Sequence, residues 1–175
     1  NRDSGVGPLV TALWDQDCYY NAQCPEDENG PCGHALVGCG ATAMGMLMRY
    51  WGYPENGMGW HSYTPDGYPE QSVSFSGTTY DWANMPDQLT ETSTQEEIDA
   101  VSTLLWHCGV AVNMQYGSGW SGSSVEGIFN ALMSFFNYSE ELSFEDRSSY
   151  TDASWKAKLK DCLDLGRPLR YAGRN

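Results

Sequence analysis

One nearly uncharged segment places the strongest limit on how this chain can fold. Residues 39–51 read Cys-Gly-Ala-Thr-Ala-Met-Gly-Met-Leu-Met-Arg-Tyr-Trp, and Arg49 carries their only charge. The segment is followed by Gly52 and Pro54, which are signals for the end of a helix. A helical segment that is apolar on every side is typical of the interior of a domain. We therefore expect a buried α-helix over 39–51, with Cys39 at its N-terminus.

The position of Cys39 has a chemical consequence. A free thiol is mostly protonated at neutral pH, and the unpaired N–H groups of a helix N-terminus favour the thiolate. Gly38 and Gly40 flank the cysteine and permit a tight turn and the close approach of a substrate backbone. These residues suit a nucleophile, although an ordinary buried cysteine has the same signature. Upstream, Gln16 offers an amide donor that can stabilise an oxyanion together with the backbone N–H of the nucleophile, or it is a surface amide.

Three further helices are expected. Ser93 and Thr94 each precede a glutamate by three positions, a capping-box pattern that begins a helix running to Gly109. Ser123 and Glu126 repeat the pattern before a helix that ends near residue 136. The last helix is expected over 152–165. Its predicted inward residues are Trp155, Leu159, Cys162 and Leu163.

Shorter patterns indicate strands and loops. Alternating apolar residues predict a strand over 110–116, and the Gly/Ser-rich run 117–124 predicts a flexible loop. Residues 73–75 are strand-like, and 169–172 begin another predicted strand. No linker or internal repeat interrupts the chain, so residues 1–175 are treated as one domain of the α+β class.

Composition excludes several classes of function. The chain has 23 acidic and 9 basic residues and a formal charge of −14, which disfavours binding to nucleic acids or to anionic lipid. No apolar run approaches the roughly 18 residues that span a bilayer. Cysteine and histidine spacing falls short of a zinc pattern, so neither a metal nor another cofactor is expected.

The six cysteines separate into two groups. Cys18, Cys24 and Cys32 lie in a polar segment where a single disulfide is plausible, and three pairings are possible. Cys108 and Cys162 lie in apolar surroundings and are expected to be small core residues. With Cys39 free as the nucleophile, five cysteines remain, so at least one more is unpaired within the chain.

Several ordered motifs together resemble the streptopain family of bacterial secreted cysteine proteases. The motifs are Val6-Gly-Pro-Leu9, Trp14-x-Gln16-x-x-x-Tyr20-Asn21-x-x-Cys24-Pro25, Gly38-Cys39-x-Ala41-Thr42-Ala43-Met44, Tyr50-Trp51-x-Tyr53-Pro54, Phe75-Ser76-Gly77-Thr78-Thr79-Tyr80-Asp81-Trp82-x-Asn84-Met85, His107-Cys108-Gly109-Val110-Ala111-Val112-x-Met114-x-Tyr116-Gly117 and Arg167-Pro168-Leu169-x-Tyr171-x-Gly173. The resemblance implies a papain-like fold, an N-terminal propeptide in the zymogen, secretion, and cleavage of protein or peptide substrates by a Cys–His pair.

The resemblance also assigns roles to individual residues. It implies that Cys39 is the nucleophile and Gln16 the glutamine of the oxyanion hole. The loop at 117–124 resembles a stretch that lines the substrate cleft, and its expected substrate-binding residues are Gly117, Ser118, Gly119 and Ser121.

The histidines depart from the family pattern. A thiol protease needs a histidine to take the thiol proton and later protonate the leaving amine. In papain-like chains it follows the cysteine by about 130–150 residues. His34 precedes Cys39, while His61 and His107 follow it too closely. His107, near the end of a predicted helix, is expected to be structural and to interact with the C-terminal helix dipole.

We therefore expect the catalytic histidine on a C-terminal segment outside these residues. It would belong to a second polypeptide made by cleavage after Asn175, or to residues that are missing, and the same segment would complete the antiparallel sheet. The alternative is a catalytically inactive, protease-like module that binds proteins through an aromatic cleft.

Overall fold

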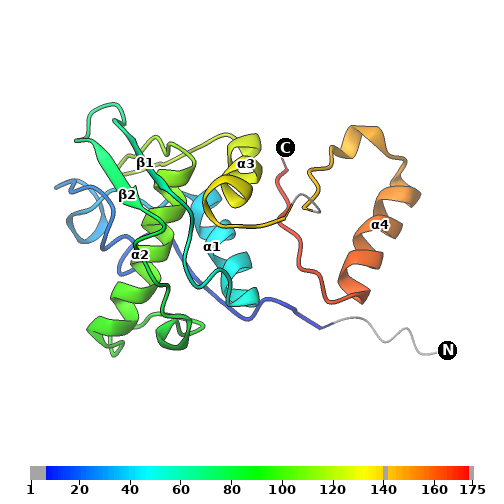
Figure 1. The fold of residues 1–175 in the computed structure, drawn as a ribbon, viewed down its shortest axis with the longest axis horizontal. Coiled ribbons are helices and arrows are strands. Elements are labelled where there is room, and N and C mark those ends of the chain that lie inside the picture. Colours follow the sequence, from blue (N-terminus) through cyan, green and yellow to red (C-terminus); the bar gives the residue numbers. More distant parts are fainter. Residues whose placement is uncertain (1–6, 140–141, 174–175) are drawn as a thin grey trace.

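The computed structural model describes residues 7–139 and 142–173. It contains four α-helices, a two-stranded antiparallel sheet and three short 3₁₀ turns within these ranges (Figure 1). The helices are α1 (Cys39–Trp51), α2 (Gln95–Ala111), α3 (Val125–Phe135) and α4 (Asp152–Asp164), the strands are β1 (Trp60–Tyr63) and β2 (Gln71–Ser74), and the turns are η1 (Pro31–Gly33), η2 (Trp82–Asn84) and η3 (Arg147–Ser149). The predicted α+β class is confirmed. The cleavage predicted after Asn175 lies outside the described residues.

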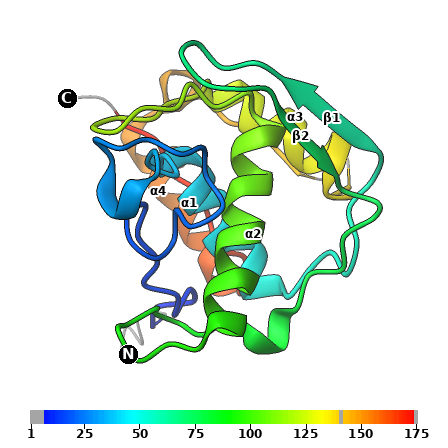
Figure 2. The same cartoon turned by 90° about the vertical axis from the view of Figure 1, so that its left-hand side faces the viewer.

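Helix α1 begins and ends where the sequence predicts. Gly38 precedes it with φ +89°, and Gly52 ends it with φ +55°, both in the left-handed range that favours glycine. At Gly45 a Cβ atom would lie 2.5 Å from Leu105 Cδ2 of α2, so this glycine lets the two helices pack closely. Helix α1 thus lies against α2 in the interior (Figure 2).

Helix α2 forms the centre of the core. Thr94 accepts a hydrogen bond from the Glu97 N–H, and the Glu97 side chain accepts one from the Thr94 N–H, which confirms this predicted capping box. The fully buried residues come from α1, from α2, and from the segments before α1, after α2, after β2 and after α3. The largest are Phe75, Phe136, Met44, Met48, Met85, Leu104 and Leu105.

The strand predicted over 110–116 is wrong. Val110 and Ala111 are the last residues of α2, and Asn113, with φ +50°, turns the chain out of the helix. The alternating pattern arises because the helix and the extended segment after it both face the core. Gln115 forms only a single bridge, with Gly122.

Helix α3 forms as expected, but its cap differs from the prediction. Ser124, not Ser123, accepts the hydrogen bond from the N–H of Gly127. The capping box predicted for Ser123 and Glu126 is therefore wrong by one residue. As a result, the Ser123 hydroxyl is free for another contact.

Helix α4 stands apart from α1, α2 and α3 in Figure 1. None of its residues is fully buried: Trp155, Leu159 and Cys162 are half-buried, and Leu163 is exposed, so the predicted inward face is wrong in degree and, at Leu163, in direction. Residues 169–172 pair with no strand within the described part of the chain, so the predicted strand there is not observed.

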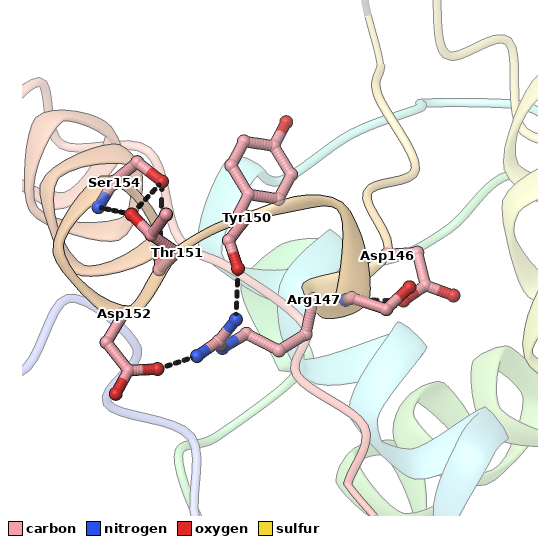
Figure 3. Close-up of polar contacts among 7 residues, drawn as sticks. Asp146, Arg147, Tyr150, Thr151, Asp152 and Ser154 are labelled. Atoms are coloured by element: carbon pink, nitrogen blue, oxygen red, sulfur yellow. Dashed lines mark hydrogen bonds and ion pairs between the residues drawn. The ribbon is translucent and has the colours of Figure 1, made fainter.

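Local polar contacts organise the start of α4 (Figure 3). Thr151 caps the helix by accepting from the Ser154 N–H at 3.2 Å. Arg147 donates to the carbonyl of Tyr150 at 2.7 Å and forms an ion pair with Asp152. No helix in the described ranges has the length and apolar character needed to cross a membrane.

Candidate active site

Cys39 presents its side chain at the head of α1. It is exposed, while the residues on either side of it, Gly38 and Gly40, are buried. Gly38 has no side chain to cap the helix, so no side-chain hydrogen bond caps the N–H groups of the first turn next to the sulfur. A Cβ atom at Gly38 would lie 2.7 Å from Met114 Sδ, which only glycine avoids. The structure thus places one accessible thiol on a rigid, buried element.

Gln16 lies beside the segment that leads into Cys39. Its backbone carbonyl accepts a hydrogen bond of 2.9 Å from the N–H of Val37, two residues before Cys39. The neighbouring Trp14 is buried and donates from Nε1 to the carbonyl of Pro86 at 2.8 Å. These contacts fix the backbone of the Gln16 segment next to that of Cys39.

A disulfide stabilises the same region. Cys18 is joined to Cys32, which selects one of the three pairings that the sequence left open. Within the segment it closes, Asn21 donates to the carbonyl of Pro31 at 2.8 Å. The other four cysteines are free, and Cys24 and Cys108 are buried as small core residues. The bridge therefore links the chain just after Gln16 to the chain just before Cys39.

The loop after α2 contacts the segment that precedes Cys39. The Gly117 carbonyl accepts from the N–H of Leu36 at 3.0 Å, and the Ser121 hydroxyl accepts from the N–H of Gly117 at 3.0 Å. Of the four predicted substrate-binding residues, Gly117 and Ser121 thus lie against the segment before Cys39. Ser118 is half-buried and Gly119 is exposed, farther out on the loop.

Trp120 lies on the same loop and carries no role in the sequence prediction. Its side chain is 71% exposed, and its indole lies over Gly122, where a Cβ atom would come within 2.3 Å of the ring. A large exposed aromatic side chain offers apolar surface to a ligand. Its tryptophan identity and Gly/Ser setting were the only signals in the sequence.

The three histidines have partners away from Cys39. His107 is buried and its Nδ1 lies 2.9 Å from the Tyr80 hydroxyl. Burial lowers the pKa of His107 to about 4, so the ring is neutral. Its structural role agrees with the prediction, but the predicted interaction of a charged ring with the helix dipole is wrong.

The other two imidazoles bond to loops. His61 Nε2 lies 2.7 Å from Asn113 Oδ1, and the ring packs on Phe135. His34 Nδ1 lies 2.8 Å from the carbonyl of Cys24. The described ranges contain no group of three or more His, Cys, Asp or Glu side chains able to hold a metal ion.

A cavity of about 510 Å³ separates α1 and α3 from the C-terminal residues. Its apolar lining includes Met44 of α1, Ile128 and Leu132 of α3, and Leu159 of α4. Arg170 also lines it, and sequence reasoning assigned this residue no role because it occupies a variable position within the 167–173 motif.

Comparisons with known proteins find similar sequences in one protease family. The model of the peptidase C10 family matches residues 14–175. The thiol protease/hemagglutinin PrtT of Porphyromonas gingivalis is 34% identical over 92% of this chain and 18% of its own length. Streptopain of Streptococcus pyogenes is 30% identical over 80% of this chain and 37% of its own length. The chain therefore spans well under half the length of these curated relatives.

Solved structures show the same fold. Wild-type interpain A, a cysteine protease of Prevotella intermedia, superposes with a TM-score of 0.85 and 34% identity, over 93% of this chain and 67% of that one. A prointerpain A fragment gives the same TM-score with 33% identity, over 52% of its own chain. The predicted papain-like cysteine protease fold is confirmed.

Proposed function

Because the chain belongs to the peptidase C10 family, we propose that it carries the nucleophile of a cysteine endopeptidase that hydrolyses peptide bonds in protein substrates. The observation that carries the proposal is the exposed thiol of Cys39 on the first residue of a buried helix. The backbone carbonyl of Gln16 accepts a hydrogen bond from the N–H of Val37, two residues before Cys39. A helix N-terminus favours the thiolate, and the Gln16 segment would supply the amide donor for the oxyanion.

In the proposed reaction, the Cys39 thiolate attacks the scissile carbonyl and forms a tetrahedral intermediate. The negative charge on the former carbonyl oxygen is stabilised by the Gln16 amide and the Cys39 N–H. The C–N bond then breaks, the amine leaves with a proton from a histidine, and water hydrolyses the thioester. Gly117, Ser118, Gly119 and Ser121 would line the path of the substrate backbone.

We assign the histidine to a polypeptide segment that follows the described residues in the full protein. The support is that His34, His61 and His107 each bond elsewhere. By similarity to its relatives, the protein would be secreted and made with an N-terminal propeptide; a solved prointerpain A fragment is consistent with that.

Thiol alkylation tests the activated nucleophile without requiring the histidine. At pH 6 a thiol of ordinary pKa is almost entirely protonated, so a stabilised Cys39 thiolate should react with iodoacetamide about tenfold faster or more. Cys39→Ser should abolish the fast phase, and Cys162→Ser should leave it intact because that thiol is half-buried in α4. A Cys39 that reacts no faster than a small free thiol would overturn the proposal.

A second function is a protease-like module that binds proteins without cleaving them. All three histidines have hydrogen-bond partners away from Cys39, which favours this non-enzymatic function. In that case, an unfolded polypeptide would quench the fluorescence of wild type but not of Trp120→Ala, while Cys39 would show only ordinary thiol reactivity. Fast alkylation of Cys39 would favour the first function, and quenching that persists in Trp120→Ala would contradict the second.

A further inference from the structure

Two polar side chains from distant parts of the sequence meet beside the nucleophile. A Cβ atom placed on Gly40 would lie 3.2 Å from the Ser123 hydroxyl and 3.8 Å from Arg170 Nη2. Gly40 directly follows Cys39, Ser123 precedes α3, and Arg170 comes from the segment after α4, which runs between α3 and α4 in Figure 1. The fold therefore places a hydroxyl and a guanidinium at Gly40, the residue that directly follows Cys39.

Both side chains have unsatisfied polar atoms. Arg170 Nε and Ser123 Oγ are buried and have no hydrogen-bond partner among the residues that the structure describes. Buried polar groups in native proteins nearly always have partners, because each unsatisfied group costs about 1–3 kcal/mol. Two such atoms at one location are available to a ligand that would supply the missing contacts.

The other cations around the cavity are already paired. Arg147 forms its ion pair with Asp152, as Figure 3 shows, and Lys158 lies 2.8 Å from a carboxylate oxygen of Glu145. Arg170 forms no ion pair with a described residue. It is thus the cavity-lining cation that remains available for an anion.

The charge of Arg170 reaches the sulfur. Burial lowers the pKa of Arg170, and the negative charge of a Cys39 thiolate acts in the opposite direction. A guanidinium nevertheless stays protonated in proteins, so the site keeps its positive charge. In a chain of net charge −14, this isolated cation favours an acidic ligand at a place where the rest of the molecule repels one.

We propose that Arg170 and Ser123 form a carboxylate-binding subsite that directs substrates with an aspartate or glutamate close to the scissile bond toward Cys39. A guanidinium binds a carboxylate through two parallel N–H donors, and a serine hydroxyl adds a third donor. The inference names a substrate class for the proposed protease and rests on that function. Arg170 acts here as a specificity residue, because it contacts the substrate side chain and not the reacting bond.

A pair of alkylating reagents tests the subsite on the 175-residue chain. Iodoacetate and iodoacetamide react identically: the thiolate forms an S–C bond, the C–I bond breaks and iodide leaves. They differ only in that iodoacetate carries a carboxylate, so the ratio of their rates at Cys39 measures recognition of the anion. We expect Arg170→Gln to lower the iodoacetate-to-iodoacetamide ratio about tenfold, because a charge-assisted hydrogen bond is lost.

Matched variants separate the subsite from general charge effects. Arg167→Gln removes the same charge from an exposed residue three positions away and should leave the ratio within about twofold of wild type. Ser123→Ala should lower the ratio less than Arg170→Gln does. Arg170→Lys should give a ratio between those of wild type and Arg170→Gln, and it replaces the glutamine variant if that variant does not fold. Equal ratios in wild type and Arg170→Gln, or an equal fall in Arg167→Gln, would overturn the subsite. Slow iodoacetamide alkylation in wild type would instead overturn the proposal of an activated nucleophile. The two failures are distinguishable because the intrinsic reactivity of the thiol cancels in the ratio of the two rates.

Discussion

The helical body around α1 and α2 and the C-terminal region, defined as residues 142–173, are stabilised in different ways. In α2, nine residues including Leu104 and Leu105 are buried, whereas α4 has no buried residue. The ion pairs of the described residues, in contrast, all lie in the C-terminal region. They join Arg147 to Asp152, Lys158 to Glu145 and Lys160 to Asp164.

The two kinds of contact differ in strength. Burial of a large apolar side chain contributes about 1.5–3 kcal/mol, whereas an exposed ion pair contributes about 0–1 kcal/mol. The body should therefore define the global stability, and the C-terminal region should open at lower free energy. Cys39 lies on the part expected to be stable and Arg170 on the weaker part, so the proposed nucleophile should be held more rigidly than the proposed specificity residue.

The same substitution in both regions should produce the largest contrast. Leu104→Ala removes a side chain that is 0% exposed in α2 and should lower the free energy of unfolding by about 2–5 kcal/mol, because it leaves a cavity. Leu163→Ala in α4, where the side chain is 36% exposed, should lower it by less than about 1 kcal/mol. Urea unfolding followed by tryptophan fluorescence measures both. Equal losses would contradict the comparison.

Acidification should weaken the body through His107. Burial lowers its folded-state pKa to about 4, below the ordinary value near 6.5 of the unfolded chain. Between these values the unfolded state binds the proton and the folded state does not, so stability is lost as the pH falls. The loss from this group should be about 2 kcal/mol between pH 7 and pH 5.

Two variants isolate this effect from the titration of the carboxylates. His107→Gln should flatten the pH dependence by the stated amount, since glutamine does not titrate. Tyr80→Phe removes the hydroxyl 2.9 Å from His107 Nδ1 but leaves the histidine buried, so the slope should persist. Urea midpoints at the two pH values decide the matter, and an unchanged slope in His107→Gln would show that the ring is not buried in its neutral form.

Local sequence signals were sufficient for the helices. Gly38, Gly52 and the Thr94 capping box mark their own boundaries, because each acts within a few residues of the helix end. The end of α2 was misjudged because Val110 and Val112 alternate with polar or small neighbours whether the chain is helical or extended. At Ser123 and Ser124, two adjacent residues could both cap a helix, and the sequence pattern alone does not distinguish them.

The candidate site required more than local patterns. Cys39 is predicted from its helix and Gln16 from its amide donor, and the family resemblance implies the same roles for both, whereas Arg170 follows Cys39 by 131 positions in the sequence. Nothing in its immediate neighbours indicates that the chain returns to the nucleophile there. The predicted burial of the α4 face is wrong for a related reason. Periodicity identifies the apolar face of a helix but not how completely another element covers that face.

The two threonine caps give the smallest and most selective test of the comparison. Thr94 and Thr151 make the same contact, each accepting from the N–H three residues later, and replacement by alanine costs about 1 kcal/mol. Thr94→Ala should lower the urea midpoint of the whole body, because α2 is its centre. Thr151→Ala should accelerate hydrogen exchange of the α4 amides and leave the slowest amides of α2 unchanged, because α4 opens independently. If Thr151→Ala instead accelerated the α2 amides to the same extent, the C-terminal region and the body would unfold as one unit, and Arg170 would be held as rigidly as Cys39.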